Sequence, residues 1–160
     1  MTLLKSYYQL CKPNVVYMML ICAFVGMLLA EQTVSSYSYL FIALTGIALC
    51  AASAAAINQV VDREADASMT RTDQRPLPKG DLSVMHASIF AFVIGLLGSM
   101  ILYLYVNTLT MILTIGSLIG YAFIYTVYLK RATPQNIVIG GLAGAAPVSY
   151  THLTLPTIIT

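Results

Sequence analysis

Long apolar stretches without a charged residue dominate this sequence and limit what it can fold into. Asp, Glu, Lys and Arg are absent from residues 13–30, 32–61 and 82–129, which are 18, 30 and 48 residues long. About 20 apolar residues in a helix cross the ~30 Å hydrocarbon core of a bilayer. Charged residues make up only 9% of the chain, against about 25% in soluble domains. The sequence predicts an all-α membrane protein and excludes a soluble enzyme, a disordered tail and a nucleic-acid binder.

The three stretches predict four membrane-spanning helices and the start of a fifth. The second stretch holds one span after a serine-rich loop, because serines are poor residues for the centre of a membrane. The third stretch would extend ~72 Å as a single helix, so it must fold back, and Val106-Asn107-Thr108 is the expected turn. The expected spans are 13–30, 39–58, 87–106, 109–128 and the start of a fifth at 136–147.

The eight basic residues would all fall on one side of a membrane crossed four times. They are Lys5, Lys12, Arg63, Arg71, Arg75, Lys79, Lys130 and Arg131. Basic loops favour the cytoplasmic side, which predicts a multi-pass protein with a cytoplasmic N-terminus. A cleaved signal peptide is the alternative for the first stretch, but Leu28 stands where a small residue should precede a cut after Ala30.

One polar segment follows the second span and carries a regular set of oxygen ligands. Asn58, Asp62 and Asp66 are spaced by four. If the helix continues past Asn58, the three side chains share one face, about one turn apart. Two carboxylates and an amide oxygen suit Mg²⁺, which leaves its other positions to water and phosphate oxygens. The spacing therefore predicts a magnesium site.

Paired arginines follow the acidic residues. Arg71 and Arg75 are also four apart, and a guanidinium offers a planar fork of donors to phosphate oxygens. Acids and arginines together favour a site for a metal and a diphosphate. The alternative is an ordinary cytoplasmic loop, for which the basic residues alone would be a topology signal. Asn58 argues against that, because a polar group at the edge of an apolar helix is costly.

The pattern N-x-x-x-D-x-x-x-D from Asn58, followed by M-x-R-T-x-x-R-P-L-P from Met69, resembles the first aspartate-rich motif of the UbiA-type intramembrane prenyltransferases. Within that family, residues 133–147 are similar to the haem O synthase branch, as are Lys12-Pro13 and the segment 125–131. The resemblance covers roughly residues 5–147. It implies a bundle of about nine helices, of which this chain would carry four or five.

The resemblance also implies an activity and a set of site residues. Two aspartate-rich motifs would hold Mg²⁺ on farnesyl diphosphate, and a vinyl group of haem B would attack the allylic cation in a bacterial inner membrane. Haem A synthase or terminal oxidase assembly would be possible protein partners. By position, the metal ligands would be Asn58, Asp62 and Asp66; the diphosphate contacts Arg71, Arg75 and Lys130; and the aromatic residues of the prenyl cavity Tyr121 and Tyr125.

His86 interrupts the third stretch. A histidine at a helix start is more typical of a satisfied polar residue than of a ligand to haem iron, so we expect the former.

The sequence departs from the family pattern at its end. A second aspartate-rich motif is absent, and residues 148–160, with Thr at every third position from Thr151, resemble a translated sequencing adapter. We expect that tail to be non-native and the 160-residue chain to be inactive alone. Three other functions stay open: prenyl transfer to a quinone precursor, membrane transport, and a structural or assembly role.

Overall fold

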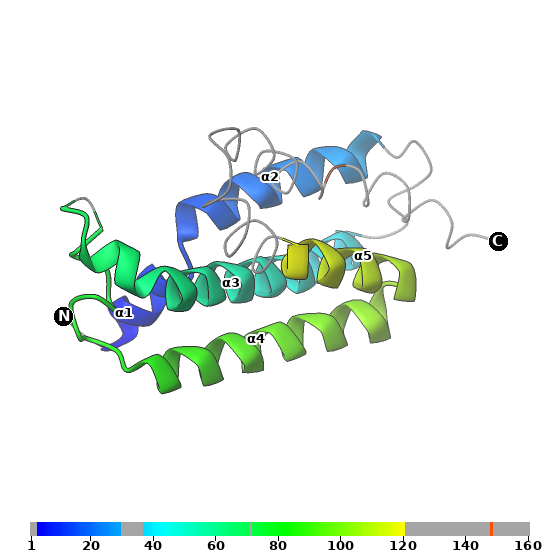
Figure 1. Cartoon of the computed structure of the whole chain (residues 1–160). Coiled ribbons are helices and arrows are strands. Elements are labelled where there is room, and N and C mark those ends of the chain that lie inside the picture. The colour runs from blue at the N-terminus through cyan, green and yellow to red at the C-terminus, as the bar shows by residue number, and fades with distance from the viewer. Residues whose placement is uncertain (1–2, 30–36, 71, 121–147, 149–160) are drawn as a thin grey trace.

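The computed structural model describes residues 3–29, 37–70, 72–120 and 148, and the described part is built from helices. Their bounds are α1 Leu3–Leu10, α2 Pro13–Leu29, α3 Tyr37–Ala67, α4 Val84–Tyr105 and α5 Thr108–Ile119. Figure 1 shows α3 and α4 running antiparallel along their full length, with α2 and α5 lying against α3. The chain turns from α4 to α5 at the end of the bundle opposite to α1.

The contact between α3 and α4 is unusually close because small residues line it. A Cβ atom built on Gly98 would lie 2.9 Å from the Gly46 carbonyl oxygen and 2.8 Å from Cys50 Sγ. Further along, the Ser53 hydroxyl donates to the Ala91 carbonyl at 2.7 Å. Small residues let membrane helices approach until their backbones touch, so this seam fixes how α3 sits in the bundle.

A sharp break separates α1 from α2, whose axes differ by 47°. Pro13 has no N–H to continue α1 and disfavours the helical conformation in the residue before it. Lys12 accordingly takes a left-handed φ of 48°. Its carbonyl accepts from the backbone N–H of Val15 at 2.9 Å, which starts α2 with Pro13 at the favoured first position.

The segment from Ser68 to Ser83 folds back against the helices. Leu77 and Leu82 are buried in an apolar cluster with Leu10 of α1 and Ala56 of α3. The turn between them uses Gly80, whose φ of 80° suits a glycine. The loop is therefore packed against the helices, and Thr72 is a polar residue of the loop that is buried.

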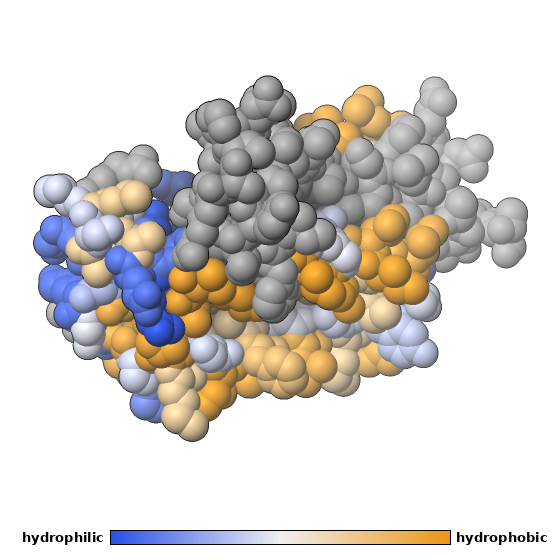
Figure 2. Space-filling view, viewed as in Figure 1, coloured by the Kyte–Doolittle hydropathy of each residue, from blue (hydrophilic) through white to orange (hydrophobic). Residues whose placement is uncertain are grey.

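Two of the described helices, α3 and α4, are long and apolar enough to cross a membrane, and α1 with α2 form a third candidate as a bent pair. The helices cover the segments expected at 13–30, 39–58 and 87–106. Their flanks expose apolar side chains such as Phe41 and Phe92. Figure 2 shows the most hydrophilic residues gathered at the end where α1, the end of α3 and the start of α4 meet.

The expected turn at 106–108 lies between α4 and α5, where the Asn107 side chain caps α5 by accepting from Thr110 N at 2.6 Å. The described part of α5 ends at Ile119, within the segment expected at 109–128. The fifth apolar segment, 136–147, lies outside the described residues, as does the tail apart from Val148.

His86 lies at the exposed N-terminus of α4. Its Nδ1 is 2.7 Å from the hydroxyl of Ser83, the residue that caps the helix. This is the satisfied polar role expected for it.

The α3–α4 seam can be tested with a single methyl group. Gly98→Ala should destabilise the chain by about 1–3 kcal/mol, because the added carbon meets backbone atoms that cannot move aside. Gly116→Ala is the matched control, since its Cβ meets no atom of the described residues within 4 Å. Thermal unfolding in detergent, followed by circular dichroism, measures both. Equal melting temperatures for the two variants would contradict the close seam.

Candidate metal and diphosphate site

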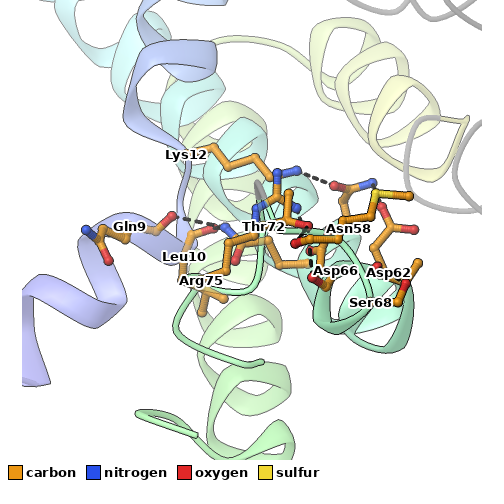
Figure 3. Close-up of polar contacts among 12 residues, drawn as sticks. Gln9, Leu10, Lys12, Asn58, Asp62, Asp66, Ser68, Thr72 and Arg75 are labelled. Carbon is orange, nitrogen blue, oxygen red and sulfur yellow. Dashed lines mark hydrogen bonds and ion pairs between the residues drawn. The ribbon is translucent and has the colours of Figure 1, made fainter. Parts of the chain in front are cut away.

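In the structure, α3 extends nine residues past Asn58 and ends at Ala67. Three oxygen-bearing side chains therefore lie on one face of the helix. Asn58, Asp62 and Asp66 are 3%, 4% and 4% exposed. Successive turns of a helix rotate residues four apart by only about 40°, so the buried face is shared. Burying two carboxylates is costly unless cations or hydrogen bonds compensate. The partners of these side chains therefore define the site (Figure 3).

Asn58 stands between an anion and a cation. Its Nδ2 donates to Asp62 Oδ2 at 3.3 Å. Its Oδ1 accepts a hydrogen bond from the ammonium of Lys12, which lies 46 residues earlier at the α1–α2 break. The amide thus orients its oxygen toward positive charge and its nitrogen toward the neighbouring carboxylate.

Asp66 is paired with the loop that follows α3. Arg75 Nη1 lies 2.5 Å from Asp66 Oδ2, and the two side chains are 31% and 5% exposed. The hydroxyl of Thr72 donates to the backbone carbonyl of Asp66 at 2.9 Å. Both contacts hold the loop against the end of α3 and place Arg75 beside Asp66.

Gln59 fastens α1 to the same turn of α3. Its Nε2 donates to the carbonyls of Gln9 at 3.0 Å and Leu10 at 3.1 Å. The last carbonyls of a helix have no partner within the helix, so a buried amide that caps them fixes where α1 ends. Only Cys11 separates Leu10, the last residue of α1, from Lys12. Gln59 therefore positions Lys12 next to Asn58.

The residues present fit a magnesium ion. Among the described residues no group of three or more His, Cys, Asp or Glu gathers, so protein ligands would be limited to the Asp62 and Asp66 carboxylates and the Asn58 amide oxygen. Mg²⁺ accepts one or two carboxylates and keeps its other positions for water and phosphate. Cationic groups already contact Asn58 and Asp66, which shows that these oxygens attract positive charge.

The structure brings together four of the eight residues singled out from the sequence: Asn58, Asp62, Asp66 and Arg75. It pairs Arg75 with Asp66, a contact that the spacing did not indicate. The other four, Arg71, Tyr121, Tyr125 and Lys130, lie outside the described residues.

Sequence reasoning missed three members of the site: Lys12, Gln59 and Thr72. Lys12 was visible only as a basic residue before the first span and part of a Lys-Pro pair. Thr72 lay inside the Arg71–Arg75 motif and was not assigned a role. Nothing in the spacing of Gln59 points to α1, because that contact depends on how the helices pack.

Comparison with known proteins identifies the relatives of the chain. The model of the UbiA prenyltransferase family matches residues 19–152. The chain is 57% identical over 143 residues to Protoheme IX farnesyltransferase 2 of Pseudoalteromonas atlantica, covering 89% of this chain and 47% of that protein. It is 56% identical over 152 residues to Protoheme IX farnesyltransferase of Idiomarina loihiensis, covering 94% and 51%. The chain therefore spans about half the length of the curated relatives it matches. No solved structure matches it.

The pairing of Arg75 with Asp66 predicts a stability difference between two arginines. Arg75→Met should cost about 2 kcal/mol, because it leaves a buried carboxylate without its cation. Arg63→Met should cost less than about 1 kcal/mol, because Arg63 and Glu64 form an exposed pair. Chemical denaturation of both variants in the same detergent measures the difference. Equal losses would show that the Arg75 pair contributes no more than a surface pair.

Proposed function

This chain belongs to the UbiA prenyltransferase family, and from that membership we propose that the whole protein transfers a farnesyl group from farnesyl diphosphate to a vinyl group of haem B. The observation that carries the proposal is the buried face of Asn58, Asp62 and Asp66, met by cations from two other segments. The names of the relatives at 56–57% identity support haem as the acceptor.

Each residue of the site has a distinct part in this proposal. Asn58, Asp62 and Asp66 would hold Mg²⁺, whose charge would stabilise the leaving diphosphate. Arg75 lies beside Asp66 and can donate to diphosphate oxygens, as a guanidinium does well. Its side chain is partly buried on a loop that packs against the helices, and donors positioned before the reaction stabilise developing charge effectively.

Four further residues complete the proposed site by their positions in the sequence. Arg71 and Lys130 would contact the diphosphate. Tyr121 and Tyr125 are four apart and would offer ring faces to a cation in the prenyl cavity. An apolar surrounding would keep water from that cation.

The proposed function also implies a location and protein partners. We place the whole protein in a bacterial inner membrane, with the N-terminus and the site on the cytoplasmic side, because basic residues favour that side. Lys12 and Arg75 contact the acidic face itself, and Arg63 belongs to the same last turns of α3. Association with haem A synthase or with terminal oxidase assembly would follow from the product.

Transfer to a quinone precursor is the second candidate, because the residues of the site serve any prenyl diphosphate. A product assay that offers haem B and 4-hydroxybenzoate to the whole protein separates the two. A farnesylated haem supports the proposal, and a prenylated benzoate replaces it. A transporter or assembly protein would give neither product.

Asp62→Asn in the whole protein should abolish Mg²⁺-dependent farnesyl transfer, with a loss of at least about 100-fold, because the substitution removes a metal-binding charge. The protein should still fold, since an amide of the same shape can accept from Asn58. Product formation and thermal unfolding measure the two effects. Glu64→Gln is the matched control, because Glu64 is an exposed acid of the same helix outside the buried face. Equal activity of both variants would contradict the role of Asp62.

The 160-residue chain alone should show no farnesyl transfer, since the family mechanism uses a second aspartate-rich motif that this sequence lacks. The measurement is the same product assay on the purified chain with farnesyl diphosphate, haem B and Mg²⁺. Farnesylated haem from this chain would contradict the need for the second motif.

A further inference from the structure

Lys12 occupies a position in which the backbone and the side chain have different requirements. Its φ of 48° lies in a region where side chains other than Gly, Asn and Asp are uncommon. Glycine would adopt this conformation at lower cost. The backbone at the α1–α2 break thus favours a residue without a side chain, yet the position carries an ammonium that reaches Asn58. Strained positions of this kind persist where the surrounding structure fixes them, and they cluster at functional sites.

Three features of the structure fix the position of Lys12. Gln59 caps the last carbonyls of α1, the Lys12 carbonyl begins α2, and the ammonium meets Asn58 Oδ1. Asn58 and Gln59 are consecutive residues of α3 and both are nearly fully buried. The placement of the ammonium is therefore set by the same turn of helix that begins the acidic face.

Two cations of the described residues contact this face, Lys12 on Asn58 and Arg75 on Asp66. A bound Mg²⁺ would compete with both for the same oxygens, because like charges repel. Diphosphate oxygens would offer the displaced ammonium and guanidinium new partners. We therefore expect metal and diphosphate to bind together, with the lysine and the arginine changing partners.

We propose that Lys12 is a diphosphate ligand that Asn58 holds in place while the site is without metal. With Mg²⁺ bound, the Asn58 oxygen would no longer hold the ammonium of Lys12, which would then donate to a diphosphate oxygen. Lys12 would thus contact first Asn58 and then the substrate. This inference rests on the proposed function and adds to it a residue outside the aspartate-rich motif.

The test measures metal binding rather than turnover. Mn²⁺ is titrated into the whole protein in detergent, with and without inorganic pyrophosphate, and bound Mn²⁺ is followed by electron paramagnetic resonance. In the unsubstituted chain, pyrophosphate should tighten Mn²⁺ binding. In Lys12→Met that enhancement should fall by about tenfold, the size of one charge-assisted hydrogen bond, while Mn²⁺ binding without pyrophosphate stays equal or improves. Lys12→Arg should restore most of the enhancement.

Lys5→Met is the matched control, because Lys5 is an exposed lysine of α1 and its loss changes net charge equally. Lys12→Gly separates backbone from charge, since it suits the positive φ but removes the ammonium, and it should behave as Lys12→Met does. An unchanged enhancement in Lys12→Met would overturn the role of Lys12 and leave the proposed function standing. Failure of pyrophosphate to affect Mn²⁺ binding in the unsubstituted chain would overturn both.

Discussion

The length of α3 is the constraint on which the rest of the structure depends. Its 31 residues extend about 46 Å, whereas about 30 Å suffices for the hydrocarbon core of a membrane. The first part is apolar and packs through small residues against α4. The last two to three turns pass beyond the apolar stretch and carry Asn58, Asp62 and Asp66 on their buried face. Because the helix is unbroken, the packing that orients its membrane part also orients the site.

Burial explains why the site draws on segments far apart in the sequence. Two carboxylates on neighbouring turns repel each other and lose their water, so an acidic helix face of this kind needs cations from elsewhere. The loop after α3 supplies Arg75, and the break before α2 supplies Lys12. The apolar residues Leu77 and Leu82 hold the loop against α1 and α4. Packing and charge therefore act together, and neither would fix this arrangement alone.

Much of the fold follows from the sequence because the membrane imposes simple rules. Uncharged stretches indicated the helices, and the excess length of the third stretch predicted a turn at 106–108, where the structure shows Asn107 capping α5. The i, i+4 spacing placed the three oxygen-bearing side chains on one face of α3. Pairings between segments could not be predicted in this way. The contact of Arg75 with Asp66 and that of Lys12 with Asn58 depend on how loops fold back, which no local pattern records.

Which small residues form the seam between α3 and α4 depends on how the two helices pack. Ser53 of α3 lies in this seam, where it donates to Ala91 of α4. Gly95 and Gly98, which meet α3 most closely, carry no periodic signal stronger than that of Gly116 and Gly120. The partner helix decides which glycines lie in a close contact, and the sequence of one helix does not indicate which helix will be its partner.

The capping of α1 by Gln59 has a practical consequence for anyone handling this protein. Helix α1, Leu3–Leu10, is held at its C-terminal end beside the acidic face. A bulky fusion or purification handle attached next to α1 would therefore strain the same contacts that place Lys12 beside Asn58. Handles belong on another part of the molecule, and the N-terminal residues should be kept when the chain is shortened.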